Sequence, residues 1–385
     1  MRNITTVSVG RSDYNITKSL YEILSKDKKV ALNLVAIGAH FSKDYGYSFQ
    51  NINKSLFKKI IKIKLNLTQN NEINQNNCIS TIIYEAGKYF KNNKVDLLLI
   101  LGDRFEMLAV VIAAMNFRIP IAHIHGGELS LGAIDDSIRH SISKLSHLHF
   151  VTHAKYKKRL IQLGEMSKNI FITGSLSNDR LDKIDYLSKN ELELKYQFKF
   201  RKRNILITYH SETLDGLYSN KQIVELLRAL KSFDENHTFL YTSPNNDIGS
   251  KNIIKKIKEL CKNQKNHYFI KTTKNDDYFS LMKNFDVVVG NSSSGIIEAP
   301  YFKKPNINIG NRQEGREKAI SNIDCHAKEK NIIRSIKMGL SDNFKSQLRY
   351  MKNPYYKKYS NKIISQKIVG LSLNKIIKKR FLDII

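Results

Sequence analysis

The sequence predicts an α/β protein built from two Rossmann-like, doubly wound domains, and three observations support this prediction. The chain has 385 residues, more than one compact core usually holds, so its length favours two domains. Hydrophobic residues make up 41% of it, a proportion typical of a globular protein. Short apolar runs alternate with longer amphipathic stretches, which is the pattern of repeated β-α-β units with parallel strands.

The first half of the chain contains six apolar runs that we expect to be strands of an N-terminal domain, residues 1–186. Residues 97–101 are apolar at every position, which indicates a strand buried on both faces of a parallel sheet. The expected strands are 5–9, 31–37, 95–101, 120–124, 149–151 and 170–173, and the expected helices include 16–26, 79–91 and 106–116.

The second half repeats the pattern after a break. Residues 187–203 are charged and carry no strand signal, so we expect a linker there, followed by a C-terminal domain of residues 204–360. The tail 361–379 has apolar residues at helical spacing and predicts a closing helix that packs back on the N-terminal domain. The expected strands of this half are 205–209, 238–241, 267–270, 286–290 and 306–309, and the expected helices are 221–233, 252–262 and 278–283.

The formal net charge of +29 raises the question of a nucleic-acid partner. Most lysines are scattered among Asn and Ile, as in residues 54–62, which we expect to line a solvated helix face. No nucleic-acid-binding motif accompanies the charge, so we expect no nucleic-acid partner. The low-complexity segment 69–77 is expected to be a surface loop.

The cysteines and the N-terminus favour a cytoplasmic protein. Cys78, Cys261 and Cys325 are far apart and form no Cys-x-x-Cys pair, so we expect buried free thiols rather than disulfides or a zinc site. Residues 1–10 are too short and too polar for a signal peptide, and no apolar run approaches the ~18 residues of a membrane span. We therefore expect no membrane partner.

In doubly wound sheets ligands bind beyond the carboxyl ends of the strands, so the residues that follow each expected strand are candidates for chemistry. Gly10 and Arg11 follow the first strand, where backbone N–H groups and a guanidinium can meet a phosphate, although Gly10 with Asp13 equally fits a plain helix cap. Asp103 and Arg104 follow the buried strand, and a structural salt bridge is the alternative to a functional pair there.

The segment 123–136 is the richest in chemistry. It contains His123, His125, Glu128, Asp135 and Asp136 around a Gly-Gly turn. Three interpretations fit such a cluster: a metal site, general acid–base catalysis, or acids that cap a helix N-terminus. Neither a tight Cys/His pairing nor an Asp-x-Asp spacing is present, so we disfavour the metal.

The second half also places polar groups after its strands. His210 follows the first of them, where it could meet a diphosphate or serve as a cap. Ser292 and Ser293 lie at a strand-to-helix turn of the kind that holds phosphate, with Glu298 after them. Arg312 follows another strand. This distribution predicts a nucleotide held mainly by the second domain, with its sugar acted on by the first.

Together these motifs resemble the hydrolysing UDP-N-acetylglucosamine 2-epimerases of bacterial sialic-acid and legionaminic-acid synthesis. The resemblance runs in order from about residue 4 to residue 320. The segments that carry it are GRSDY at 10–14, LGDRFE at 101–106, HIHGGE at 123–128, IDDSIRHSISK at 134–144, QLGE at 162–165, GNSSSG at 290–295 and GNRQ at 310–313.

The resemblance implies a glycosyltransferase-B-like fold with the ligand in an interdomain cleft, no metal and no other cofactor. The implied reaction removes the C2 proton, eliminates UDP to give a glycal, and adds water with inversion at C2, so that UDP-N-acetylglucosamine yields UDP and N-acetylmannosamine. It assigns acid–base roles to Asp103 and Asp135. The residues it implies for UDP binding are Arg11, Asp13, Arg104, His210, Ser292, Ser293, Glu298 and Arg312.

One position departs from the pattern of other members, including the animal enzymes. They carry a catalytic Glu at this position, whereas this chain, like the bacterial sialic-acid type, has His125 and keeps Glu128 three residues later. We favour Glu128 for the acid–base role because a carboxylate preserves the chemistry, although His is the commonest general base in enzymes.

Other functions remain as alternatives. The same reaction on UDP-N,N'-diacetylbacillosamine, a non-hydrolysing UDP-N-acetylglucosamine 2-epimerase and a glycosyltransferase of the same fold would each use a similar nucleotide site. A homodimer or homotetramer is usual among the relatives, and we expect one here.

Overall fold

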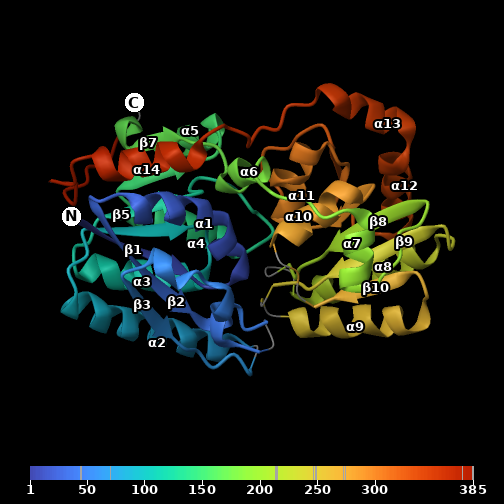
Figure 1. Cartoon of the computed structure of the whole chain (residues 1–385), viewed down its shortest axis with the longest axis horizontal. Helices are drawn as coiled ribbons and strands as arrows, with labels where there is room; N and C mark the ends of the chain where they lie inside the picture. Colours follow the sequence, from blue (N-terminus) through green and yellow to red (C-terminus); the bar gives the residue numbers. More distant parts are fainter. Residues whose placement is uncertain are drawn as a thin grey trace. The chain divides into compact units, whose positions relative to one another are not determined.

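The computed structural model describes residues 1–43, 46–69, 71–212, 216–245, 247, 249–271, 273, 275–374 and 376–383. The chain forms two compact units, which are described separately (Figure 1). Unit 1 comprises Met1–Glu128, Asp135–Arg180 and Tyr355–Ile385, and unit 2 comprises Leu129–Ile134 and Leu181–Pro354.

Unit 1 contains a parallel sheet of seven strands among the described residues, in the order β3-β2-β1-β4-β5-β6-β7. The order reverses between β1 and β4, which makes their carboxyl ends the switch point of a doubly wound fold. The strands are β1 (Arg2–Ser8), β2 (Val30–Ile37), β3 (Lys59–Ile63), β4 (Leu97–Leu101), β5 (Ile121–Ile124), β6 (Leu148–Val151) and β7 (Ile170–Ile172). The α-helices are α1 (Arg11–Lys26), α2 (Glu72–Asn92), α3 (Phe105–Asn116), α4 (Asp135–Leu145), α5 (Ala154–Gln162), α6 (Leu176–Leu181) and α14 (Ser360–Gly370).

Strand β4 shows why this sheet forms. Leu97 and Leu99 belong to a core shared with α1 and α14, whereas Leu98 and Ile100 belong to a core shared with α2 and α3. Side chains alternate between the two faces of a strand, so an entirely apolar run fits only a strand covered on both sides. The predicted double burial of this strand is confirmed, since all its residues are buried.

Unit 2 contains a second parallel sheet, with six strands among its described residues in the order β10-β9-β8-β11-β12-β13. The order again reverses, here between β8 and β11. The predicted fold class, two Rossmann-like α/β sheets, is thus confirmed. The strands are β8 (Arg203–Thr208), β9 (His237–Thr242), β10 (His267–Ile270), β11 (Val287–Gly290), β12 (Asn306–Ile309) and β13 (Asn322–Cys325). The α-helices are α7 (Lys189–Tyr196), α8 (Gly216–Lys231), α9 (Ser250–Asn263), α10 (Asn275–Asn284), α11 (Ser293–Ile297), α12 (Glu329–Leu340) and α13 (Asp342–Gln347).

Two local predictions in the first half are wrong. The lysine-rich segment 54–62 is not a helix face, because Lys59–Ile63 forms β3, an edge strand paired with β2. Lysines suit an edge strand because they discourage pairing with another chain. The expected loop 69–77 is helical from Glu72 onward, and the side chain of Asn71 caps this helix by accepting the Asn74 N–H at 2.9 Å.

The expected linker 187–203 and the expected tail helix also differ from the structure. The linker region contains α7, which begins with a capping box formed by Ser188 and Glu191 and buries Leu192 in unit 2. The tail helix is shorter than 361–379: α14 ends at Gly370, after which Leu371 is extended. This helix lies against α1 of unit 1 (Figure 1).

Two further properties concern the whole described chain. None of its helices combines the length and the apolar character that a membrane crossing requires. All three cysteines are free thiols; Cys78 is buried, and Cys261 and Cys325 are half-buried.

The return of the C-terminal segment to unit 1 yields a stability prediction. Gly174 has a φ of +74°, and a Cβ there would lie 2.5 Å from the Lys357 Cβ and 3.1 Å from the Tyr355 carbonyl oxygen. We expect Gly174→Ala to lower the unfolding free energy of unit 1 by roughly 2–4 kcal/mol, measured by urea unfolding with circular dichroism. Gly87→Ala is the control, because its Cβ meets nothing closer than 3.8 Å in α2. Equal stabilities of the two variants would contradict the prediction.

Candidate functional site

In unit 1 the predicted residues near Gly10 and Asp103 follow the two strands at the switch point. Arg11 begins α1 directly after β1, and Asp103 and Arg104 follow β4, with Arg104 at the N-cap of α3. Gly102 has a φ of +79°, a left-handed conformation that turns the chain sharply between strand and helix. The side chain of Arg104 donates to Glu106 at 3.1 Å, so this arginine is held in place at the strand end.

Asp13 lies in the first turn of α1. Its Oδ2 accepts the Val9 N–H at 2.8 Å, which closes the turn between β1 and α1. Burial raises the pKa of this carboxyl, against the opposing effects of its hydrogen bonds and of the charge on Arg104. Its Oδ1 is buried and has no hydrogen-bond partner among the described residues. The structure therefore supports a role for Asp13 in the turn.

His123, on β5, holds two strand ends together from inside the protein. Its Nε2 donates to the Gly102 carbonyl oxygen at 2.7 Å, and its Nδ1 accepts from the Ser143 hydroxyl at 3.1 Å. Burial lowers the pKa of His123 to about 3, so the ring is neutral at physiological pH. This histidine is a structural link between β4, β5 and α4 and is not placed to exchange protons with a substrate.

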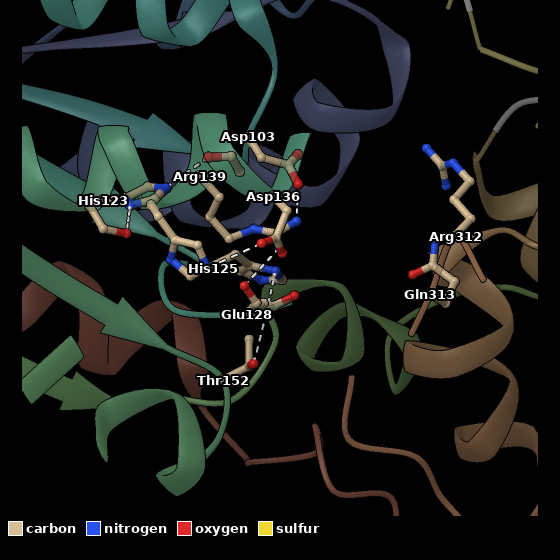
Figure 2. A network of polar contacts seen from close by, with 12 residues as sticks. Asp103, His123, His125, Glu128, Asp136, Arg139, Thr152, Arg312 and Gln313 are labelled. Carbon is tan, nitrogen blue, oxygen red and sulfur yellow. Dashed lines mark hydrogen bonds and ion pairs between the residues drawn. The ribbon is translucent and has the colours of Figure 1, made fainter. Parts of the chain in front are cut away.

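His125 and Glu128 lie together at the end of β5 (Figure 2). The Nδ1 of His125 is 3.2 Å from Oε1 of Glu128. The same oxygen accepts a hydrogen bond from the Thr152 hydroxyl at 2.9 Å, which comes from the end of β6. Glu128 is 1% exposed and His125 is 9% exposed. Two adjacent strand ends thus hold one imidazole and one carboxylate in contact.

Arg139 connects this pair to Asp103. It lies on α4, is 1% exposed, and donates from Nη1 to the backbone oxygen of Glu128 at 2.9 Å. Its Nη2 donates to the carboxylate of Asp103, and its Nη1 lies 4.0 Å from Asp136 (Figure 2). Two carboxylates therefore share one buried cation. Asp135 is the first residue of α4, next to Asp136.

In unit 2 the buried side chain of Asn291 organises the strand ends. Its Oδ1 accepts the His210 N–H at 2.7 Å, and its Nδ2 donates to the His210 carbonyl oxygen at 2.9 Å. The ring of His210 is fixed in turn, because its Nδ1 accepts the Asn245 N–H at 3.1 Å. Asn291 follows β11 and His210 follows β8, so this link spans the switch point of the second sheet.

The loop after β12 meets the same asparagine. The backbone oxygen of Asn291 accepts from Gln313 at 3.0 Å and from Arg312 Nη1 at 3.3 Å. Glu212 accepts the N–H groups of Asn311 and Arg312 at 3.1 and 3.3 Å, which fixes the loop backbone. The Nε of Arg312 is buried without a hydrogen-bond partner in the described part of the chain. The guanidinium is thus positioned and keeps donor capacity for an anion.

The predicted serine turn forms the short helix α11. Ser292 is its N-cap and accepts the Ser294 N–H at 3.3 Å, so its hydroxyl is used partly for capping. Ser293 begins the helix and remains half-buried. Glu298 is the C-cap and is buried. These three predicted residues therefore lie on one short segment after β11.

The segment between Glu128 and Asp135 belongs to unit 2. A Cβ on Gly132 would lie 2.7 Å from the carbonyl of Asn311 and 2.8 Å from the Arg312 nitrogen, so only glycine allows this close approach. The Leu131 N–H also donates to the Glu314 carbonyl oxygen at 3.4 Å. The chain that links the two predicted acids of unit 1 is thus packed against the loop that carries Arg312.

Sequence reasoning missed several members of these networks. Arg139 lies within the segment 134–144, three residues after Asp136, and this spacing on a helix was a usable signal. Thr152, Asn291 and Gln313 are ordinary polar residues after strands, and nothing in their types marks them. Among the described residues no group of three or more His, Cys, Asp or Glu side chains is arranged to hold a metal ion.

Comparison with known proteins gives one consistent result. The family described as UDP-N-acetylglucosamine 2-epimerase matches residues 22–369. The GDP/UDP-N,N'-diacetylbacillosamine 2-epimerase (hydrolyzing) of Campylobacter jejuni is 39% identical over 100% of this chain and 99% of that protein. The polysialic acid biosynthesis protein P7 of Escherichia coli is 38% identical over 93% of this chain and 91% of that protein.

A solved structure shows the same fold. The UDP-GlcNAc 2-epimerase from Neisseria meningitidis, determined with UDP-GlcNAc bound, superimposes with a TM-score of 0.79. It is 19% identical in sequence, and the match covers 96% of this chain and 100% of that one. At this identity the likeness supports the fold and says nothing of the ligand.

The buried His123 predicts a pH dependence of stability. Its pKa in the folded chain, about 3, lies below the unfolded value of about 6.5, so the unfolded chain binds the proton first. The contribution of the neutral, buried ring to the unfolding free energy is present in full above about pH 6.5. It falls as the pH drops toward 3, by up to about 1.4 kcal/mol per pH unit. We expect His123→Asn to lower stability at pH 7 and to reduce this slope, measured by urea unfolding between pH 7 and pH 4.5. His326→Asn, which removes an exposed histidine, is the control. An unchanged slope in the His123 variant would refute the assignment.

Proposed function

Because the chain belongs to the UDP-N-acetylglucosamine 2-epimerase family, we propose that it is a hydrolysing UDP-sugar 2-epimerase. The observation that supports this most is the network formed by Asp103, Arg139, Glu128 and His125 at neighbouring strand ends. It gathers carboxylates and an imidazole, the groups that take and give protons at a carbon atom, around one buried cation.

The proposed reaction has two stages. First, the proton on C2 of the sugar is removed while UDP leaves C1, which gives a glycal with a C1=C2 double bond. Water then adds, with the hydroxyl going to C1 and a proton to the opposite face of C2. The products are UDP and the free sugar inverted at C2. We propose that Asp103, His125, Glu128 and Asp135 serve the proton transfers of these stages.

The nucleotide requires a different set of groups. A leaving diphosphate carries negative charge, and preorganised cations and N–H donors stabilise it as it departs. Arg312 supplies such a cation on a loop that Glu212 and Asn291 fix. The hydroxyls of the serine turn add donors, and the buried Glu298 can accept from ribose hydroxyls. The full set that we propose for UDP binding is Arg11, Asp13, Arg104, His210, Ser292, Ser293, Glu298 and Arg312.

Two substrates are candidates. Our first candidate is UDP-N-acetylglucosamine, which would yield N-acetylmannosamine for sialic-acid synthesis; the name of the E. coli relative is consistent with this. The second is UDP-N,N'-diacetylbacillosamine, because the relative at 39% identity over the whole chain carries that substrate in its name. The two sugars differ at C4 and C6, away from the reacting carbons.

Product analysis tests the function. We expect the purified protein, incubated in D2O with one of the two nucleotides and no acceptor, to release UDP and the free sugar with one deuterium at C2, identified by NMR. Replacing the first carboxylate, Asp103→Asn, should lower kcat roughly 100- to 10,000-fold because a proton-transfer group is lost. Release of an intact UDP-sugar epimer would indicate a non-hydrolysing enzyme. Turnover only after an acceptor is added would indicate a glycosyltransferase.

UDP affinity tests the second unit. We expect Arg312→Ala to weaken UDP binding by roughly 10- to 100-fold, measured by isothermal titration calorimetry. This loss corresponds to one charge-assisted hydrogen bond of about 1.5–3 kcal/mol. Lys318→Ala is the matched control, because that cation is closely paired with Asp324 at 2.8 Å, whereas Nη2 of Arg312 lies 3.8 Å from Asp247. Equal losses in the two variants would mean that the effect is general electrostatics and that Arg312 is not a specific ligand.

A further inference from the structure

We propose that Nε2 of His125 is the atom that accepts the C2 proton, and that Glu128 is a positioning residue that holds the imidazole. The proposal rests on the function proposed above and deepens it. It reverses the preference drawn from the sequence, which favoured Glu128 for the proton transfer because it is a carboxylate.

The first argument is the position of the Glu128 carboxylate. The residue is 1% exposed, and its Oε1 faces the Thr152 hydroxyl at 2.9 Å and the His125 Nδ1 at 3.2 Å. A carboxylate oxygen only accepts hydrogen bonds, so Nδ1 carries the ring proton. Oε1 of Glu128 is thereby committed to protein groups, as expected of a residue that orients a histidine.

The second argument is the state of the other ring nitrogen. With the proton on Nδ1, the lone pair of the neutral imidazole is on Nε2. This atom is buried and has no hydrogen-bond partner in the described part of the chain, whereas Nδ1 contacts Glu128 (Figure 2). Unsatisfied buried polar atoms are rare in folded proteins and require an explanation. A bound substrate that presents a proton to this atom supplies one.

The third argument is the backbone under His125. Its φ is +67°, a left-handed conformation that a residue other than glycine rarely adopts. Its N–H is fixed by the Phe150 carbonyl oxygen at 2.9 Å. Gly126, which follows, leaves no room for a Cβ beside the His123 ring and the Ser143 hydroxyl, at 2.9 Å from each. Strain of this kind concentrates at functional sites, where it fixes the direction of a side chain.

Among the charged groups near the His125 ring, Glu128 is the anion that contacts it. Arg139 is paired with Asp103 and lies 4.0 Å from Asp136, and it also donates to the Glu128 backbone oxygen. The other groups near the turn are the neutral ring of His123 and the guanidinium of Arg159, which donates to the Gly127 carbonyl oxygen. An imidazolium formed at His125 is therefore stabilised by the Glu128 carboxylate, beside two cations that oppose its charge.

The C2–H bond breaks and its proton goes to Nε2, its electron pair forms the C1=C2 bond, and the C1–O bond breaks with its pair going to the departing diphosphate. The imidazolium later returns its proton to solvent. Nδ1 faces the Glu128 carboxylate at 3.2 Å, so the carboxylate acts through the ring and not on the sugar.

Four variants test the division of roles, with glycal formation and the pH profile of kcat/KM as readouts. His125→Gln should lower kcat roughly 100- to 10,000-fold, as expected for loss of a general base. Glu128→Gln keeps an oxygen atom that can face Nδ1 and removes the charge. It should lower kcat by about 10-fold at unchanged KM, and the acidic limb of the profile should move to lower pH because the imidazolium loses its stabilising anion. Thr152→Val should lower kcat and move the acidic limb to lower pH as Glu128→Gln does, but by smaller amounts. His326→Gln should match the wild type.

Some results would overturn the proposal. If folded Glu128→Gln is inactive while His125→Gln keeps near-wild-type kcat, the carboxylate is the base. If Glu128→Gln leaves the acidic limb in place, Glu128 does not act through the ring. These failures are distinct from failure of the proposed function, in which the wild-type protein itself releases no UDP from either nucleotide.

Discussion

The contact between the Arg139 guanidinium and the Asp103 carboxylate is the interaction on which the first unit's site depends. It joins the end of β4 to the interior face of α4, and the second donor of the same guanidinium reaches the backbone beside the His125 turn. A buried cation without an anionic partner destabilises the folded protein, so the fold is stable only with carboxylates close to Arg139. The geometry of the turn, and with it the orientation of the imidazole, follows from this one placement.

In the second unit a neutral side chain holds the strand ends together. Asn291 is fully buried and uses both its amide and its backbone oxygen, which ties together the loops after three strands. An amide adds no net charge, so Arg312 and His210 keep their own electrostatic character for an anionic ligand. The two units thus share a fold and differ in what holds their strand ends: an ion pair beside the proposed proton-transfer groups, and an amide beside the proposed phosphate-binding groups.

Sequence reasoning identified the fold class and most strands because parallel, doubly covered strands such as Leu97–Leu101 carry an unmistakable apolar pattern. It failed where a local pattern fits two structures. The segment Lys59–Ile63 alternates weakly and is rich in lysine, which fits an exposed helix as well as an edge strand, and only the neighbouring β2 decides between them. The start of α2 was readable, since Asn71 is a good N-cap, but the polar residues after it resemble a loop.

The sequence indicated which residues follow the strands of unit 1, but not how His125 and Glu128 are arranged there. The order of His125 and Glu128 in the sequence says nothing of which one is enclosed. That depends on Thr152, from another strand, and on the left-handed backbone of the turn. Spatial partners of this kind come from tertiary packing, which a single sequence does not encode in any short pattern.

The path of the chain has a consequence for how the protein is made. Unit 1 is finished only when Tyr355–Ile385 has been added, because α14 covers its sheet beside α1 and the Ser175 N–H donates to the Tyr355 carbonyl oxygen. On the ribosome, where domains usually fold as they emerge, the N-terminal sheet lacks α14 over part of one apolar face while all of unit 2 is synthesised. The last thirty or so residues therefore complete the folding of unit 1. A chain that lacks them would leave apolar surface of this unit exposed to solvent and prone to aggregation.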